Sequence, residues 1–490
     1  MGQQKLRLLT APEGSGSLLC CALSPHDGGT TLAAGGEGAA AMLFDVRSGG
    51  DAVTARLTAS AGCFERDDAV TSVAFNPGRP ELLYCASGCA VTAWDVRMLP
   101  TGDRASRGSS VEREAPQRTA DGSNRSVSGD ADGEGAERRS GSPGHLAPVH
   151  RYAFNADEIS HVAINKKGAA LAAADDGGEV AVVDISGGGA SGKLIRTLKG
   201  GHGSLASGAL FRDHKPWDVV SGGLDCAVVK WDYSRTSPVA RWNITELAAA
   251  ETAAEAETEG ATPSGQTQMC NPPFVHAVAS APGSDDPAAA SCADVALAAR
   301  RLVAAACGDG TVALIDVDLP APGAASSGAG RTNRAGKGKS KSGRAGGGGD
   351  DGGGAFGGTR RVLFLGRVPG EGHASAVNHV AFPGWGGGGL LLSGGNDRHV
   401  KLWDWRAVAA ESSRREGEGG NGVGGGGSGT ERCPRDGPDP KGLVLSFKHG
   451  RKVNWLCGSF SPEAAAATGG ADTFVADTSE RISVYALARG

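Results

Sequence analysis

Residues 221 to 232 read Ser221-Gly222-Gly223-Leu224-Asp225-Cys226-Ala227-Val228-Val229-Lys230-Trp231-Asp232. Residues 393 to 404 repeat the pattern as Ser393-Gly394-Gly395-Asn396-Asp397-Arg398-His399-Val400-Lys401-Leu402-Trp403-Asp404. In each stretch an apolar run ends in a turn of small residues, and a second apolar run then closes on Trp-Asp. Short apolar runs on either side of a tight turn are typical of an antiparallel pair of β-strands.

The same kind of unit recurs seven times along the chain. Because one such unit leaves open strand edges, it is stable only beside neighbours or closed into a ring. Seven is a common number for closure, so the sequence predicts an all-β fold, a seven-bladed β-propeller formed as a single domain by residues 1–490. Residues 5–9 alternate like a strand and are expected to complete the last blade. We place the blades at about 17–47, 67–97, 157–185, 202–232, 272–317, 373–404 and 449–487.

Four segments between these units differ from them in composition. Glycine makes up 80 of the 490 residues, and the segments at about 98–150, 243–270, 318–360 and 407–441 are rich in small and charged residues. Such segments cannot bury enough apolar surface to offset an ordering entropy of ~1–2 kcal/mol per residue. We therefore expect long disordered loop insertions at the blade rims, with one short helix over Thr245 to Glu259.

The net charge indicates which classes of partner to expect, and the cysteines indicate the compartment. The net charge is -5, which favours neither a nucleic acid nor a membrane surface as the partner. No C-x-x-C pair occurs among the 11 cysteines. Most of them stand in strand-like runs, which indicates reduced thiols and an intracellular protein of the cytoplasm, the nucleus or both. No apolar stretch approaches the ~20 residues that a membrane helix needs.

The sequence carries no enzyme or cofactor signature. It lacks an H-E-x-x-H helix, a Cys/His cluster at zinc spacing and a close pair of acids outside turns. The segment Gly187 to Leu194 is one residue short of a phosphate-binding loop, and Leu194 stands where Mg²⁺ needs a hydroxyl. We expect no cofactor, no metal and no catalysis. Proteins are the expected partners, bound by a monomer within a larger complex.

The two quoted units resemble the WD-repeat family almost residue for residue. The resemblance implies a hydrogen-bonded set in each unit, in which Ser accepts from the buried Trp indole and His joins the Ser to the Asp of the turn. His, Ser and Asp also match a hydrolase triad, but recurrence in two blades favours architecture over chemistry. The sets are His202, Ser221, Asp225 and Trp231, and His373, Ser393, Asp397 and Trp403.

Three units carry an Arg two positions beyond their closing Asp. They read Phe44-Asp45-Val46-Arg47, Trp94-Asp95-Val96-Arg97 and Trp403-Asp404-Trp405-Arg406. This resembles the WDxR box of propellers that act as substrate receptors for cullin-4 RING ubiquitin ligases and dock on the damaged-DNA-binding adaptor. Period-two alternation places each Arg at the rim where its strand ends. We expect bare guanidinium groups there that anchor a partner, although an Arg at this place can also cap its own blade.

Other readings stay open. Asn271 to Ala277 and His449 to Leu456 resemble one branch of the WD-repeat family in particular, which implies a candidate ligase receptor without naming a substrate. The same ring suits a chromatin or ribosome-assembly scaffold, and a propeller enzyme would need clustered polar groups around the central channel. A basic run would then serve as a nuclear address: Arg331, Arg334, Lys337, Lys339, Lys341 and Arg344.

Overall fold

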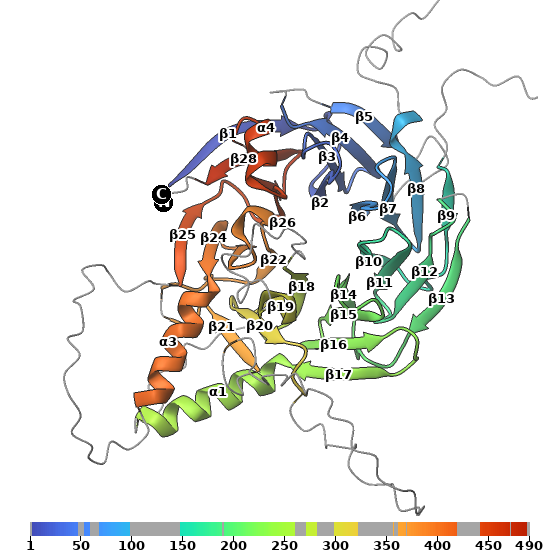
Figure 1. Cartoon of the computed structure of the whole chain (residues 1–490). Coiled ribbons are helices and arrows are strands. Elements are labelled where there is room, and N and C mark those ends of the chain that lie inside the picture. Colours follow the sequence, from blue (N-terminus) through green and yellow to red (C-terminus); the bar gives the residue numbers. More distant parts are fainter. Residues whose placement is uncertain are drawn as a thin grey trace, which may run out of the picture.

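The computed structural model is a ring of seven four-stranded antiparallel sheets around a central axis (Figure 1). It describes residues 2–47, 53–58, 68–98, 148–188, 191–259, 271–281, 298–321, 356, 361–368, 370–418, 442–470 and 472–487. The predicted fold, an all-β seven-bladed propeller, is confirmed.

Each blade begins with its innermost strand and runs outward. Blade 1 contains β2 (Leu18–Leu23), β3 (Thr31–Gly36), β4 (Ala40–Asp45) and β5 (Val53–Thr58). Blade 2 contains β6 (Val70–Phe75), β7 (Leu82–Ser87), β8 (Ala90–Asp95) and β9 (His150–Tyr152). Blade 3 contains β10 (Ile159–Ile164), β11 (Ala170–Asp175), β12 (Val180–Asp184) and β13 (Lys193–Leu198).

The remaining blades follow the same order. Blade 4 contains β14 (Ala206–Phe211), β15 (Asp218–Gly223), β16 (Ala227–Asp232) and β17 (Pro238–Asn243). Blade 5 contains β18 (Val275–Ser280), β19 (Leu302–Cys307), β20 (Val312–Asp316) and β21 (Val362–Leu365). Blade 6 contains β22 (Val377–Ala381), β23 (Leu390–Gly395), β24 (His399–Asp404) and β25 (Leu443–Lys448). Blade 7 contains β26 (Val453–Gly458), β27 (Thr473–Asp477), β28 (Arg481–Leu487) and β1.

The N-terminal strand closes the ring. Strand β1 (Gln3–Thr10) pairs antiparallel with β28, from Gln3 opposite Leu487 to Thr10 opposite Arg481. The sheet order β1-β28-β27-β26 makes the first strand of the chain the outermost strand of the last blade. The two ends of the described chain therefore hold each other, and the ring has no open blade.

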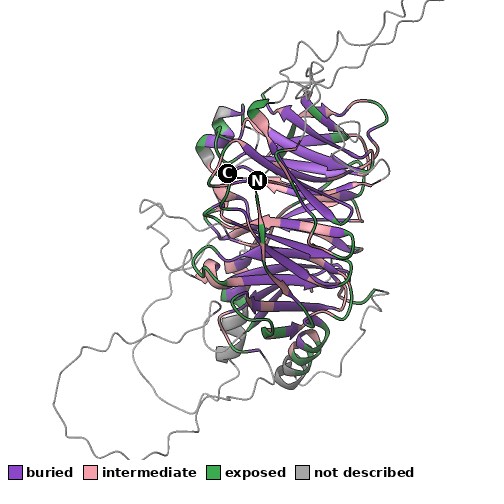
Figure 2. Ribbon diagram, turned by 90° about the vertical axis from the view of Figure 1, so that its right-hand side faces the viewer, coloured by how far each residue is buried: buried purple, intermediate pink, exposed green. Residues whose placement is uncertain are grey.

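The core lies between neighbouring blades, whose strands are buried through most of their length (Figure 2). Between blades 4 and 5, Val220 and Val228 pack against Val275 and Val303. A Cβ atom added to Gly222 would lie 2.5 and 2.7 Å from methyl carbons of Val275 and Val278. The small residues of the repeat are thus required because the sheets approach closely.

Every innermost strand contains a β-bulge at its second residue. The register shifts between the first and third residues of β2, β6, β10, β14, β18, β22 and β26. A bulge leaves one residue unpaired and re-aims its side chain. Each blade therefore presents one extra side chain beside the central channel.

The helix expected over Thr245 to Glu259 is confirmed as α1 (Ile244–Glu259), whereas α3 (Trp405–Glu418) covers the start of a segment that was expected to be disordered. Leu247 of α1 is 6% exposed, and Trp405 and Ala409 of α3 are also buried, so both helices gain apolar contacts that composition did not reveal. Arg367 fastens α1 to blade 5 through Glu251 at 3.3 Å and the carbonyl of Ala248.

Most of the other expected insertion residues lie outside the described part. Strand β9 begins at the end of the segment expected over 98–150, and β17 ends at the first residue of the segment expected over 243–270. Short helical segments elsewhere in the described part include α4 (Pro462–Ala467), which Ser461 caps, and the 3₁₀ turns at Val96–Met98 and Gly384–Gly386. None of the helices in the described ranges combines the length and apolar character that crossing a bilayer requires.

Candidate protein-binding site

An Asp closes the third strand of six blades by the same turn. Its Oδ1 atom accepts a hydrogen bond from the backbone N–H two residues later, at 2.9 to 3.0 Å. Because the third strand has the same place and direction in every blade, these turns lie on one face of the ring. The six residues are Asp45, Asp95, Asp184, Asp232, Asp316 and Asp404.

The same turn decides where the Arg side chains of the WDxR-like boxes go. Arg97 donates from Nε to Asp95 Oδ1 at 2.9 Å and from Nη2 to Asp95 Oδ2 at 2.6 Å. Arg47 makes the same pair of bonds to Asp45, at 3.0 and 2.9 Å. We expected bare guanidinium groups, and this was wrong, because a turn that holds the Arg N–H on the carboxylate also brings the side chain over it.

The two guanidinium groups remain accessible despite this pairing. The Arg97 side chain is 70% exposed and the Arg47 side chain 60% exposed. A guanidinium carries five N–H donors, so side-on pairing through Nε and Nη2 leaves three for another molecule. The hydrogen bonds from the Arg side chains also lower the pKa of Asp45 and of Asp95 below the usual carboxyl value.

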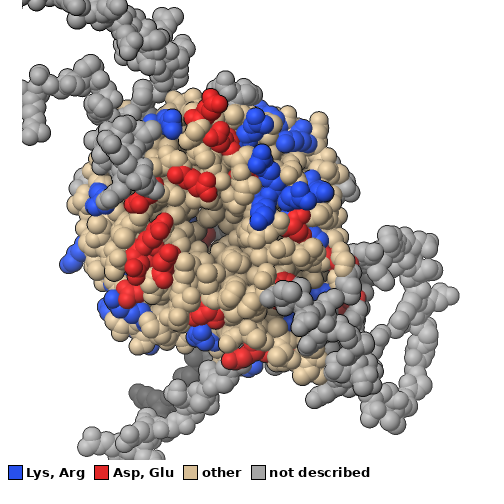
Figure 3. Space-filling model, turned by 180° about the vertical axis from the view of Figure 1, so that it is seen from behind, with Lys and Arg blue, Asp and Glu red and all other residues tan. Residues whose placement is uncertain are grey.

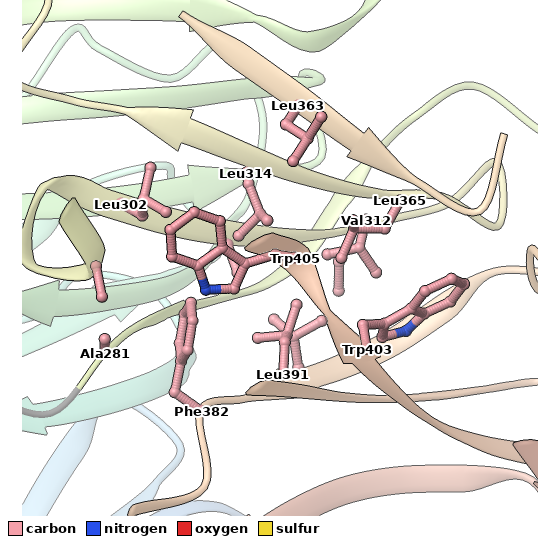
Figure 4. Close-up of a cluster of buried hydrophobic side chains, with 14 of the residues drawn as sticks. Ala281, Leu302, Val312, Leu314, Leu363, Leu365, Phe382, Leu391, Trp403 and Trp405 are labelled. Carbon is pink, nitrogen blue, oxygen red and sulfur yellow. The ribbon is translucent and has the colours of Figure 1, made fainter. Parts of the chain in front are cut away.

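Arg406 is placed differently from the other two. It pairs with Asp404 in the same way, at 2.9 and 2.8 Å, but its side chain is only 38% exposed. The neighbouring Trp405 starts α3 and is buried among Leu302, Leu314 and Phe382 (Figure 4). In blade 6 the box therefore anchors a helix. In blades 1 and 2, which are neighbours of each other, the Arg side chain of the box remains accessible.

The two His-Ser-Asp-Trp sets are present as continuous chains. In blade 4, Trp231 Nε1 donates to Ser221 Oγ at 2.8 Å, and His202 contacts Ser221 at 2.8 Å and Asp225 at 3.0 Å. A Ser that accepts from Trp must donate to His Nε2, which leaves the His Nδ1–H for the Asp. Each Ser is fully buried, so it is closed to any substrate. Blade 6 repeats the chain with Trp403, Ser393, His373 and Asp397 at 2.8 to 2.9 Å.

Blades 7 and 3 contain a different hydrogen-bonded set at the corresponding place, which sequence reasoning missed. His449 stands at the His position of blade 7, bonds Asp477 at 2.7 Å and accepts from Tyr485 Oη at 2.8 Å. In blade 3, Asn155 bonds Asp175 at 2.9 Å in the corresponding place. In both blades the Asp stands at the end of the second strand rather than in the turn. The signal available in the sequence was a His or Asn four residues before a first strand.

The bulged residues form a ring of bonds between blades at one mouth of the channel. Five of the seven bulged side chains donate to the carbonyl of the first residue of the next blade, at 2.5 to 2.9 Å, and so fasten the two blades together. The pairs are Thr71 to Ile159, Ser160 to Ala206, Ser207 to Val275, Asn378 to Val453 and Asn454 to Leu18. Sequence reasoning missed these residues because a bulge has no signal in the apolar pattern.

Three aromatic rings stack inside the channel. Trp455 of blade 7 lies between His379 of blade 6, at a centroid distance of 4.1 Å, and His161 of blade 3, at 5.5 Å. Burial lowers the pKa of His161 to about 4, and burial followed by the nearby His161 lowers the pKa of His379 to about 3. Both rings accept a backbone N–H at Nδ1, which fits the neutral form.

The channel mouth is a hollow of about 330 Å³, and it does carry clustered polar groups. Five of those side chains are used in the blade-to-blade bonds, and within the described ranges no three His, Cys, Asp or Glu side chains are arranged to hold a metal. The basic run at residues 331 to 344 lies outside the described residues. Among the described side chains, the exposed Arg residues of blades 1 and 2 are the clearest candidates for contact with a partner.

Comparison with known proteins agrees with the repeat pattern. Residues 366–404 match the family model of the WD domain, G-beta repeat. The chain is also similar to the WD repeat-containing protein 53 homolog of Dictyostelium discoideum, with 24% identity over 167 residues. This match covers 34% of the chain and 40% of the relative, and it concerns the branch that Asn271 to Ala277 and His449 to Leu456 resemble. The chain is a WD-repeat β-propeller.

Proposed function

We propose that this protein is a substrate receptor of a cullin-4 RING ubiquitin ligase. The ring docks on the damaged-DNA-binding adaptor through Arg97 and Arg47 and acts as a scaffold without catalysis of its own. WD-repeat propellers are in general protein-interaction scaffolds. The finer assignment depends on one observation, namely that two adjacent blades present matching Arg side chains, 70% and 60% exposed, on the same face.

The geometry supports different contributions of the three boxes to adaptor binding. In Arg97 and Arg47, the pairing with Asp orients a planar guanidinium and leaves three donors for carbonyls or carboxylates of the adaptor. A side chain that is held in place before binding loses less conformational entropy on association. Arg406 is half as exposed as Arg97 and contributes less, because its neighbour Trp405 is committed to the core.

A pull-down of the adaptor with purified variants tests this role. Arg97→Ala and Arg47→Ala are each expected to reduce adaptor recovery by about tenfold, as for an interface anchor, and Arg406→Ala by less. Arg235→Ala is the matched control, because Arg235 lies on the same face, is 75% exposed and pairs with Asp232 at 3.5 Å but stands three rather than two residues beyond its Asp.

The outcome separates docking from general charge effects. Recovery that is equal for wild type, Arg97→Ala, Arg47→Ala and Arg406→Ala would remove the proposed role of these boxes. The same loss in Arg235→Ala would also contradict it, because it would reflect charge rather than the box. Circular dichroism of each variant ensures that the compared rings are folded.

A further inference from the structure

The face of the ring seen from behind is charged unevenly (Figure 3). Lys and Arg side chains gather in one sector beside the central opening, while Asp and Glu side chains gather on the other side of the opening. The rear view exchanges left and right, so the basic sector corresponds to the part of Figure 1 where β1 and β28 lie. That part is blade 7, where the ring closes.

A pocket of about 460 Å³ lies in this blade and is larger than the hollow of the channel mouth. Its wall comes from three places: β1, the loop between β25 and β26, and the turn between β27 and β28 together with the start of β28. Each place contributes one exposed cation, Lys5, Arg451 and Arg481 respectively. The volume falls within the usual range of ligand pockets, roughly 300–1,000 Å³.

The acids and bases of this pocket are not balanced. Asp477 accepts from His449 at 2.7 Å and from Ser479, and Glu480 accepts the backbone N–H of Gly16 at 3.2 Å. Neither carboxylate pairs with a cation of the pocket. Within the described residues no carboxylate lies at ion-pair distance from Lys5, Arg451 or Arg481. Three positive charges therefore remain unmatched around one hollow.

The floor of the pocket is rigid. His449 is 2% exposed and is held on both sides, by Asp477 and by Tyr485 Oη. Burial opposes ionisation of Asp477, but the hydrogen bonds from His449 and Ser479 together outweigh it and lower the pKa of Asp477. The carboxylate thus stays charged and bound to His449, and it leaves the three outer cations to face solvent.

The spacing of the cations distinguishes a peptide from a small anion. Lys5 stands opposite Tyr485 on β28, four residues from Arg481, which corresponds to about 13 Å along the strand. Several charges spread along one ligand therefore match these cations better than a single phosphate does. An extended chain with a carboxylate at every second residue presents successive negative charges about 7 Å apart on one side.

We propose that this pocket binds an acidic, extended peptide segment of a partner protein. Carboxylates of the segment pair with Lys5, Arg451 and Arg481, and the segment contacts both the N-terminal strand β1 and the C-terminal blade. Binding therefore stabilises the closure of the ring. None of the residues that line the pocket belongs to the Arg97 and Arg47 boxes, so the site can be tested without the adaptor.

Fluorescence anisotropy with a labelled peptide of alternating Glu and Gly tests the proposal on the full chain. The wild type is expected to bind it, and the matching peptide with Gln in place of Glu is expected to bind at least about tenfold more weakly because it lacks the charges. Arg451→Glu combined with Arg481→Glu should weaken binding of the Glu peptide by about tenfold or more. Lys167→Glu combined with Lys215→Glu changes the net charge equally, away from the pocket, and should bind like the wild type.

A second readout concerns ring closure. Amide hydrogen exchange of β1 should slow when the Glu peptide is added to wild type and should not change in the Arg451→Glu, Arg481→Glu variant. Equal weakening in the Lys167→Glu, Lys215→Glu control, equal binding of the Gln peptide, or no binding by the wild type would each overturn the site. Tighter binding of an oligouridylate at the same cations would overturn the peptide as its occupant.

Discussion

Trp94 shows how a single buried side chain of the repeat is satisfied when its usual partner is missing. Cys85 stands where the complete repeats have Ser221 and Ser393, so the indole N–H has no Ser to bond. Instead Trp94 Nε1 donates to Thr92 Oγ1 at 3.0 Å, and Thr92 donates to the carbonyl of Cys85. A buried donor needs an acceptor, and the nearest hydroxyl on its own strand supplies one.

Removing that hydroxyl is expected to destabilise blade 2. Thr92→Val keeps the volume but removes the hydrogen bond that Trp94 Nε1 donates to Thr92 Oγ1, so the free energy of unfolding should fall by about 0.5–1.5 kcal/mol. Thr197→Val is the control, because Thr197 lies in an outer strand and is only half-buried. Urea unfolding measures both, and a Thr92→Val protein as stable as the control would contradict this account of Trp94.

At the scale of elements, the seven bulged inner strands hold neighbouring blades together. Five of the bulged side chains bond a carbonyl of the next blade, whereas Leu19 in blade 1 has no polar group to offer. The bond of Asn454 to the carbonyl of Leu18, at 2.9 Å, crosses the junction between the last and first blades. It therefore reinforces from inside the closure that β1 makes from outside.

Loss of this bond should loosen the junction. Asn454→Leu is expected to cost about 0.5–1.5 kcal/mol and to speed amide hydrogen exchange in β2 and β26 more than elsewhere. The reverse change, Leu19→Asn, places an amide where the ring lacks one and should not speed exchange in these strands. If Asn454→Leu and wild type exchange at the same rates in β2 and β26, the bond has no role in closure.

At the scale of the whole molecule, acid should open the ring through its central histidines. Below pH 6.5, the ordinary pKa, the unfolded chain takes up protons at His161 and His379, whereas the folded ring does so only near pH 4 and pH 3. The unfolded state then binds more protons, so the free energy of unfolding falls as the pH falls through this range. Burial lowers the pKa of His276 and His373 as well, which acts in the same direction.

Melting temperatures measured from pH 7 to pH 4 test this dependence. The wild type should lose stability steadily below pH 6.5, and the double variant His161→Gln, His379→Gln should show a shallower decline from a lower starting value. His150→Gln, outside the channel, should keep the wild-type slope. An unchanged slope in the double variant would mean that other groups govern the acid sensitivity.

The candidate site shows which features the sequence predicts and which it does not. A pattern of residues two apart predicts that Arg47, Arg97 and Arg406 leave their strands on one face, because a strand alternates with a fixed period. It does not predict that each Arg folds onto its own Asp, nor that Arg406 is half as exposed as Arg97. Those outcomes depend on the turn after the strand and on Trp405, whose burial requires blade 5 as a neighbour.

The sequence by itself determined the number of blades and the hydrogen-bonded sets of blades 4 and 6, because turn chemistry and apolar alternation are local properties that repeat. Only the tertiary structure decided which charges stay unmatched. Lys5, Arg451 and Arg481 are far apart in the chain and become one pocket when β1 joins β28. Neither charge pairing nor burial can be read locally, because both depend on which strands the closed ring brings together.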